Sequence, residues 1–412
     1  MPQYWRLALS ALLLATSTSG EAPTDYAGAQ VFRIATSLLP IPDFLQNLDV
    51  DVWAHNKNFT DVMVTTNKLQ HMKHVLQEYG IPYEVMISNV QTMIEMESVL
   101  PLSDEHQHRA KGPGFSFDKY NRLNVIHDYL DTLANNYSDI VTVGIMGYSH
   151  EKRPLKYIKI SSSNPNAKAF FIDGGIHARE WISPAATLYI VKELVENRHT
   201  LPAHMLDLDF YILPVLNPDG YEYTHTSNRL WRKNRSRAYM GCRGVDLNRN
   251  FGFKWGGKGT SGSSCSEIFR GKKPFSEPES QAVAEFISSY KNDIEVYLSL
   301  HSYSQLILLP YGYDRIYPDD FSDLKAVSDR AAAAMLQSGG ESYTVGNTVD
   351  ILYEAAGGSF DWAKAEAGIK YSLTFELRDT GRYGFLLPAK QILPTSKEVF
   401  EAVKVLASAV TS

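Results

Sequence analysis

Cysteine, long apolar runs and an excess of positive charge are all scarce or missing in this chain. It has two cysteines among 412 residues and a formal net charge of -6. No uninterrupted apolar segment reaches the ~20 residues with which a helix crosses a bilayer, and the basic residues form no stripe of the kind that binds nucleic acid. These absences argue against a nucleic-acid-binding protein and against an integral membrane protein.

The first residues carry the pattern of a secretion signal. Arg6 precedes an apolar run at residues 7–15, and small and polar residues follow at 16–20. This order is typical of a signal peptide, which we place at residues 1–20. The alternative, an N-terminal membrane anchor, is disfavoured because the apolar run is short. The mature protein is therefore expected to be secreted and extracellular.

The two cysteines, Cys242 and Cys265, are interpreted in the light of that location. Thiols oxidise outside the cytosol, so a structural disulfide is favoured over a metal site. The alternative is a pair of free buried thiols.

A polar segment divides the chain into a small and a large part. Residues 103–114, SDEHQHRAKGPG, have no apolar periodicity and end in a Gly-Pro-Gly breaker. We place a linker there, so that a small domain and its linker cover residues 21–111 and a large domain covers residues 112–412. Arg109 and Lys111 in the linker suit cleavage by a trypsin-like protease, although an ordinary solvated loop carries such residues too.

Each part has its own secondary-structure pattern. The small domain has strand-like stretches at 31–35 and 83–87. It has helix-like stretches at 41–48 and 90–99. In the large domain strands alternate with helices, which predicts an α/β domain with a largely parallel, buried sheet. Its predicted strands are 169–176, 210–216, 296–300 and 371–375. One predicted helix covers 184–196, with Ser183 as N-cap and Pro184 at the first helical position. A second begins with a capping box of Ser276 and Glu279 and ends at 289. A third covers 396–409.

Ionisable residues follow three of the predicted strands. His177 and Glu180 come directly after the first, His301 follows 296–300, and Glu376 follows 371–375. Ligands bind outside the carboxyl ends of strands in open α/β sheets, so these side chains are expected to meet at one edge. Two His and one carboxylate suit a catalytic zinc ion with a place left for water, and Glu376 is the candidate general base.

A purely structural role is an alternative both for the His-Glu pair and for Glu376. A lone His-Glu pair three residues apart is more often a surface hydrogen bond than half of a metal site. Glu376 could instead be a buried carboxylate paired with Arg378.

A second group of polar residues is rich in Arg and Asn. Its members are Arg229, Arg232, Arg235, Arg249, Asn234, Asn248 and Asn250. A charge-rich stretch is usually a solvated face. Forked donors of this kind also suit a carboxylate, or the oxyanion of a tetrahedral intermediate.

Six motifs closely resemble the pancreatic-type metallocarboxypeptidases of the A/B group. They are GGIHAREWISP (174–184), NPDGYEYTHTSNRLWRKNRS (217–236), GVDLNRNF (244–251), SLHSYSQLILLPYGY (299–313), YEAAGGSFDWA (353–363) and TFELRDTGRYGFLLP (374–388). The match is ordered and extends from about residue 115 to the C-terminus. The resemblance implies a mixed, largely parallel eight-stranded sheet flanked by helices. The small domain resembles the family's inhibitory activation domain, an α+β open sandwich with an antiparallel sheet.

The resemblance also implies a role for each site residue. It assigns one Zn2+ to His177, Glu180 and His301, and the catalytic roles of base and oxyanion stabiliser to Glu376 and Arg232. The residues that it assigns to substrate binding are Arg179, Asn248, Arg249 and Tyr353. Asp246 resembles the carboxylate that orients a histidine ligand, and Cys242 and Cys265 fall where the family has a disulfide.

Phe360 stands where the resemblance puts the floor of the specificity pocket. Relatives with basic specificity have an acidic residue there, because a buried cation needs a partner. The other expected lining residues are uncharged: Leu308, Thr348, Ala355 and Thr374. We therefore expect a preference for apolar or aromatic C-terminal residues, in a pocket that the bulk of Phe360 makes shallow. Alternatively, Phe360 turns into the core.

The function expected from the sequence is that of a secreted, monomeric zymogen of a zinc carboxypeptidase. Its substrates would be peptide or protein C-termini, and a trypsin-like protease would activate it. The alternatives are the same fold with basic specificity, which Phe360 disfavours, and an inactive binding homologue, which would be expected to lack a ligand or the base. Three N-glycosylation sequons begin at Asn58, Asn136 and Asn234. The last is doubtful because a glycan beside Arg232 would obstruct the cleft.

Overall fold

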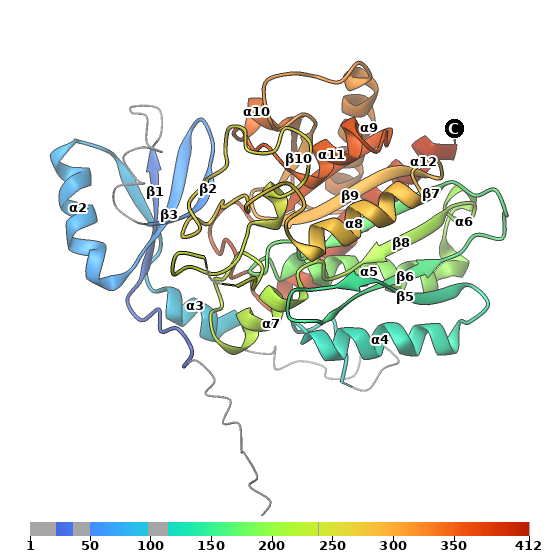
Figure 1. Cartoon of the computed structure of the whole chain (residues 1–412), viewed down its shortest axis with the longest axis horizontal. Coiled ribbons are helices and arrows are strands. Elements are labelled where there is room, and N and C mark those ends of the chain that lie inside the picture. Colours follow the sequence, from blue (N-terminus) through green and yellow to red (C-terminus); the bar gives the residue numbers. More distant parts are fainter. Residues whose placement is uncertain (1–21, 36–49, 98–113, 238, 412) are drawn as a thin grey trace, which may run out of the picture.

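The protein consists of a small domain that lies against one end of a larger one (Figure 1). The structure, a computed structural model, describes residues 22–35, 50–97, 114–237 and 239–411. The predicted helix at 41–48 and most of the predicted linker lie outside the described residues. Within the described ranges, no helix combines the length and apolar character needed to cross a membrane.

The small domain is a four-stranded antiparallel sheet with two described helices. The strands are β1 (Gln30–Ala35), β2 (Asp51–His55), β3 (Phe59–Val64) and β4 (Tyr83–Ile87), in the order β2-β3-β1-β4, and the helices are α2 (Leu69–Glu78) and α3 (Val90–Glu97), with a short 3-10 turn η1 (Thr66–Lys68). The strands predicted at 31–35 and 83–87 are confirmed. Of the helix predicted at 90–99, the described part is helical to Glu97.

Apolar side chains explain how both faces of the small sheet are covered. Helix α2 buries Met72, Val75 and Leu76, spaced at i, i+3 and i+4, against Phe32 and Val62 on one face. The other face contributes Val31, Trp53 and Met63 to a cluster that it shares with Leu230, Tyr303, Phe385 and Leu386 of the large domain. One sheet face is therefore buried within its own domain, whereas the second is buried in the interface.

The large domain contains a mixed eight-stranded sheet. Its strands are β5 (Val141–Tyr148), β6 (Pro154–Ile160), β7 (Ala169–Gly174), β8 (Asp209–Leu213), β9 (Ile294–Ser302), β10 (Leu306–Leu309), β11 (Thr344–Asn347) and β12 (Tyr371–Leu377), in the order β11-β10-β12-β9-β7-β8-β6-β5. The central strands β12, β9, β7 and β8 are parallel, and antiparallel pairs flank them. The central strands are buried almost throughout and mainly apolar, as expected for a parallel sheet that is covered on both faces.

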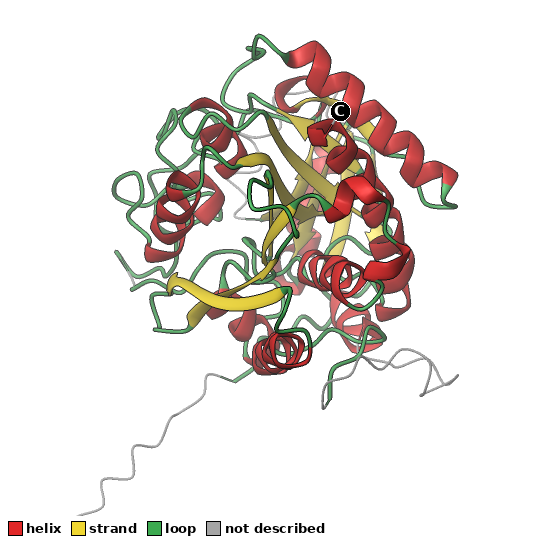
Figure 2. Cartoon of the chain, turned by 90° about the vertical axis from the view of Figure 1, so that its right-hand side faces the viewer, coloured by secondary structure: helices red, strands yellow, loops and turns green. Residues whose placement is uncertain are grey.

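Helices cover both faces of this sheet (Figure 2). They are α4 (Leu123–Asn136), α5 (Ile182–Val195), α6 (Ala203–Leu206), α7 (Pro218–Thr226), α8 (Pro278–Ser289), α9 (Phe321–Gln337), α10 (Thr348–Ile351), α11 (Ser359–Ala365) and α12 (Ile392–Thr411), with 3-10 turns η2 (Arg198–Thr200), η3 (Leu247–Arg249) and η4 (Ala389–Gln391). Helices α4, α5, α9 and α12 share one core cluster, and α8 and α11 share a second cluster. The result is the three-layer α/β architecture that the alternation of strands and helices predicted.

Both predicted helix caps in the large domain are wrong. Helix α5 begins at Ile182 rather than at Pro184, and the Ser183 hydroxyl does not cap it: it accepts from the Gly175 amide (2.7 Å) and donates to the Leu300 carbonyl (2.6 Å). The capping box at Ser276 is absent too, because that hydroxyl donates to the Glu277 side chain and the Asn250 side chain donates to it. In both places a tertiary partner takes the hydroxyl that local geometry would offer to the helix.

Cys242 and Cys265 form a disulfide, so the alternative of free thiols is excluded. The bridge joins residues 23 positions apart in a loop-rich segment. Replacing both cysteines by serine is expected to lower the free energy of unfolding by about 3 kcal/mol, because the unfolded chain regains loop entropy. Urea unfolding of the double variant measures this, with reduced wild-type protein as the matched comparison. A loss below 0.5 kcal/mol, on the order of a surface substitution, would contradict it.

Candidate active site

The predicted metal ligands meet at the carboxyl edge of the central strands. His177 and Glu180 lie in the loop after β7, and His301 lies in β9, next to Glu376 of β12 in the parallel register. Gly175 opens the loop with a positive φ of 66°, a conformation that suits glycine. The two hydrogen bonds of Ser183 then hold the loop against β9, so the alternative of a surface His-Glu pair is excluded.

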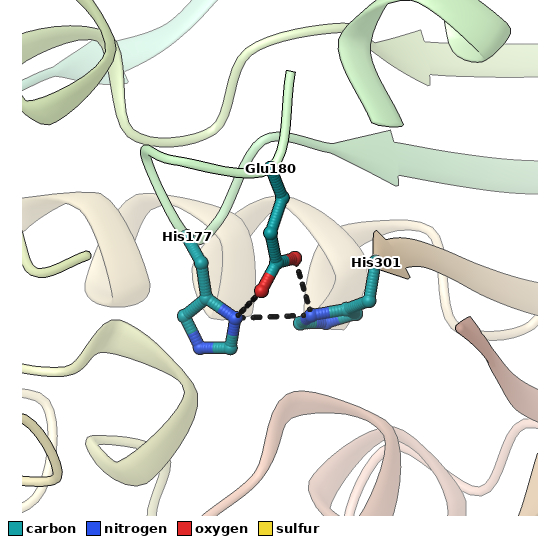
Figure 3. A group of neighbouring side chains, drawn as sticks. All are labelled: His177, Glu180 and His301. Carbon is teal, nitrogen blue, oxygen red and sulfur yellow. Dashed lines mark hydrogen bonds and ion pairs between the residues drawn. The ribbon is translucent and has the colours of Figure 1, made fainter. Parts of the chain in front are cut away.

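His177, Glu180 and His301 converge on one point (Figure 3). The Nδ1 atom of His177 is 2.8 Å from Glu180 Oε1, and the Nδ1 atom of His301 is 3.1 Å from Glu180 Oε2 and 3.1 Å from His177 Nδ1. All three side chains are buried, and their ligand atoms lie within 4.8 Å of one another.

Asp246 determines which histidine nitrogen faces this point. It accepts a hydrogen bond from His177 Nε2 (3.1 Å), which leaves Nδ1 as an acceptor that faces the acceptor oxygen of Glu180. Burial lowers the pKa of His177, and the neutral ring is the form that binds metal. Three potential ligand atoms this close together, from two imidazoles and one carboxylate, suit a zinc ion.

Arg232 is the cationic partner of the same carboxylate. Its Nη2 donates to Asp246 Oδ2 (2.9 Å), and its Nη1 lies 4.0 Å from Glu180 Oε1. Although burial opposes it, the charge of Arg232 holds the pKa of Asp246 well below its usual range. Asp246 therefore stays ionised and fixes both a histidine and the guanidinium that reaches the site.

Glu376 lines the same cavity and is not paired with Arg378. The Arg378 guanidinium instead binds Glu398 on α12, with Nε 2.9 Å from Oε1. Burial raises the pKa of Glu376 to about 7, although the positive charges of His301 and Arg232 oppose that shift. The alternative of a structural pair with Arg378 is therefore excluded.

The cavity also gathers the predicted substrate-binding residues. It is lined by Arg232, Asn248, Arg249, Tyr353 and Glu376 together with His177, Glu180, Leu308, Thr348, Ala355, Phe360 and Thr374. Phe360, in α11, lines this cavity and also packs in the core cluster. It therefore forms part of the pocket wall and part of the core at once, so both alternatives stated for it hold. Its ring also borders Gly312, where an added Cβ would lie 3.3 Å from Phe360 Cζ.

The rest of the Arg and Asn group faces away from the cavity. Arg235 stacks on Tyr223 (3.5 Å to the ring centroid), and Asn250 Nδ2 donates to the Arg270 carbonyl (2.9 Å). Arg229 forms a buried pair with Glu97 of α3, in which Nη2 lies 2.6 Å from Oε1. Of the seven residues singled out in the sequence, Arg232, Asn248 and Arg249 line the cavity.

Arg179 lies outside the cavity lining because the small domain engages it. It is almost fully buried, and its Nη1 is 2.8 Å from Asp51 Oδ2 on β2. The later residues of the same strand, Trp53, Ala54 and His55, line the cavity itself, and the His55 ring lies 6.0 Å from that of Tyr353. No motif in the sequence marks these residues, because their role arises only when the two domains dock.

Comparisons with known proteins match each of the two domains to a family model. The family described as zinc carboxypeptidase matches residues 126–402, and the family described as carboxypeptidase activation peptide matches residues 41–97. The first match covers more than half of the chain, and the second covers the small domain from residue 41 onward, without β1.

Individual relatives carry the names of both A-type and B-type enzymes. Carboxypeptidase B of Astacus astacus is 46% identical over 295 residues, which are 71% of this chain and 96% of the relative. Carboxypeptidase A2 of Rattus norvegicus is 41% identical over 368 residues, which are 88% of this chain and 87% of the relative. The solved structure of carboxypeptidase A from Helicoverpa armigera is 33% identical, has a TM-score of 0.86, and covers 94% of this chain and 99% of its own. The chain therefore belongs to the zinc carboxypeptidase family and carries that family's activation peptide.

Proposed function

We propose that this protein is the secreted zymogen of a carboxypeptidase that removes apolar or aromatic residues from the C-termini of peptides. The observation that carries the proposal is that Glu376 and Arg232 line one cavity with His177 and Glu180 of the metal triad, and that uncharged residues line its specificity side. An inactive binding homologue is disfavoured because every chemical group that hydrolysis needs is present there.

His177, Glu180 and His301 are proposed to hold the zinc ion, which would lower the pKa of a bound water and polarise the scissile carbonyl. Glu376 accepts the proton of the attacking water and passes it to the departing amine, a role that its raised pKa favours. Arg232, oriented by Asp246, donates to the oxyanion that develops on the carbonyl. Asn248, Arg249 and Tyr353 bind the terminal carboxylate, and this contact restricts cleavage to the last peptide bond.

Substrate preference is proposed to follow from Phe360. A Lys or Arg side chain entering this pocket would lose its hydration without gaining a counter-ion, which is strongly unfavourable. Leu308, Thr348, Ala355 and Thr374 line the same cavity and are equally unable to compensate a cation. Because Phe360 fills part of the floor, medium-sized side chains such as Leu should fit better than the largest aromatic ones.

The small domain is proposed to keep the precursor inactive. Trp53, Ala54 and His55 occupy one side of the cavity, and Asp51 binds Arg179, which is then unavailable to a substrate carboxylate. We further propose that residues 1–20 are a signal peptide, that a trypsin-like protease cuts the linker at Arg109 or Lys111, and that residues 112–412 act as a monomeric, extracellular enzyme.

Peptides that end in Leu, Phe or Lys test the proposed activity. After treatment with trypsin, the protein is expected to release Leu and Phe, to release Lys at least about 100-fold more slowly by kcat/KM, and to lose this activity to a chelator and regain it with zinc. Release of Lys alone would overturn the pocket argument. No release after zinc is restored would favour the inactive homologue.

Neutralising Asp51 is expected to weaken the inhibition by the small domain. The Asp51→Asn variant leaves Arg179 buried without its counter-ion, and loss of one member of such a pair costs about 2–5 kcal/mol of docking free energy. The uncleaved variant should therefore hydrolyse small peptides at least about tenfold faster than the uncleaved wild type. Glu78→Gln, on the exposed end of α2, is the matched control and should change nothing. Equal activity of Asp51→Asn and wild-type precursors would refute the proposed contact.

A further inference from the structure

The structure separates the three glycosylation sequons into two whose asparagine is exposed and one whose asparagine is built into the core. We propose that Asn58 and Asn136 carry N-linked glycans and that Asn234 does not. This inference rests on the proposed entry of the chain into the secretory pathway. It assigns one glycan to each domain.

Asn58 lies at the tip of a tight hairpin in the small domain. The loop 56–58 joins β2 to β3, and the Asn56 side chain accepts from the amides of Asn58 (2.8 Å) and Phe59 (3.0 Å). This turn directs the Asn58 side chain outward, and the residue is exposed. The neighbouring His55 ring lies 6.0 Å from that of Tyr353 in the large domain, but Asn58 itself is exposed, so a glycan there meets solvent.

Asn136 is the last residue of α4 and is exposed as well. The apolar face of that helix, with Ile126, Leu130 and Leu133, packs into the core, whereas Asn136 and Ser138 of the sequon are exposed beyond it. A glycan attached there extends away from the sheet. It displaces none of the core contacts of α4.

Asn234 differs because its side-chain amide is fully buried, and both its nitrogen and its oxygen form hydrogen bonds. Its Nδ2 donates to Glu277 Oε2 (2.7 Å) and to Glu279 Oε2 (3.1 Å), and its Oδ1 accepts from the amides of Val245 (2.8 Å) and Ser236 (3.3 Å). The residue has an exposed fraction of 0%. Asn234 thus ties the segment that carries Arg232 to the segment before Asp246 and to the start of α8.

Glycan transfer is incompatible with this role. In the transfer, Nδ2 bonds to the anomeric carbon of a lipid-pyrophosphate-linked oligosaccharide, the anomeric C–O bond to pyrophosphate breaks, and the nitrogen loses one proton. At Asn234 the lost N–H is one that donates to a glutamate, and the sugar has no room in the core. A chain modified there cannot form the native contacts, so the folded, secreted molecules are those in which Asn234 stays free.

Activation of the precursor would separate the two proposed glycans. Asn58 precedes the linker and leaves with the small domain, whereas Asn136 remains on the catalytic domain. The test is expression of the full chain in cultured eukaryotic cells, followed by removal of N-glycans with an amidase that converts each glycosylated Asn to Asp. Peptide mass spectrometry then locates the converted residues before and after trypsin activation.

We expect conversion at Asn58 and Asn136 in the intact precursor, and only at Asn136 in the activated enzyme. Asn58→Gln and Asn136→Gln should each remove one glycan. Ser236→Ala, which destroys the third sequon and keeps the Asn234 amide, should leave the glycan pattern and the activity unchanged. Conversion of Asn234 in active enzyme, or secreted protein that lacks a glycan at Asn58 or Asn136, would overturn the inference.

A leader-exchange variant separates this inference from the proposed secretion. In this variant, residues 1–20 are replaced by a leader from another secreted protein. If the native chain stays in the cell while the leader-exchange variant is secreted with glycans at Asn58 and Asn136, the sites are supported and only the native signal is refuted. If both proteins are secreted without those glycans, the secretion proposal stands and the glycan assignment fails.

Discussion

Replacing Glu376 by Gln is expected to lower kcat of the trypsin-activated enzyme by about 10²–10⁴-fold, the usual contribution of a positioned general base. Gln has nearly the same volume and keeps the polar contacts of the cavity, but it cannot accept the proton of the attacking water. The loss should appear in kcat and kcat/KM alike, since the role is confined to the transition state. Steady-state kinetics on a peptide that ends in Leu measures it.

Two controls distinguish loss of the base from loss of the metal or the fold. The zinc content of Glu376→Gln should equal that of the wild type, because Glu376 is not one of the three converging ligands. Glu366→Gln, at an exposed residue after α11, should have wild-type kinetics. A kcat within tenfold of the wild type at full zinc content would show that another group takes the proton.

Replacing Phe360 by Asp is expected to reverse the substrate preference. The carboxylate would supply the counter-ion that a buried Lys or Arg side chain needs, an effect on the order of 3–5 kcal/mol, and would disfavour an apolar side chain at the same place. The ratio of kcat/KM for Lys to that for Phe should therefore rise by about 10³-fold. Matched peptides that differ only in the last residue provide the measurement.

The control for this change is Phe360→Leu, which keeps the pocket apolar and makes the floor smaller. This variant should retain the preference against Lys and should improve hydrolysis of peptides that end in large aromatic residues. Because Phe360 also packs in the core cluster under α11, Tm is measured for both variants. If Phe360→Asp is folded and still rejects Lys, the side chain at this position does not determine the preference.

Several features of the protein were predictable because they are local in the sequence. The strand that ends before His177, the loop that carries Glu180 and the strand that leads to His301 all follow from apolar runs whose period matches a buried sheet. Parallel strands bring their carboxyl ends to one edge, so the metal triad could be predicted from the sequence. The ordered motifs singled out Arg232, Asn248, Arg249 and Tyr353, which all line the cavity, and suggested the roles proposed for them.

The tertiary structure determined the hydrogen-bond and ion-pair partners of the buried polar groups. Ser183 and Ser276 have the local signature of helix caps, yet β9 and Asn250 take their hydroxyls. Arg229 and Arg232 are the same residue type and close in sequence, but only Arg232 lines the cavity. Arg229 is instead bound by Glu97 of the small domain.

The sequence by itself determined the fold class and placed the three candidate metal ligands at one sheet edge, because apolar periodicity and strand ends are properties of short segments. Only the folded chain decided that Asp51 holds Arg179, that His55 lies beside Tyr353, and that Asn234 is an internal tie. The physical reason is that a buried polar side chain must satisfy its hydrogen bonds with whatever group folding brings beside it. That group comes from a distant part of the chain, and no local pattern specifies it.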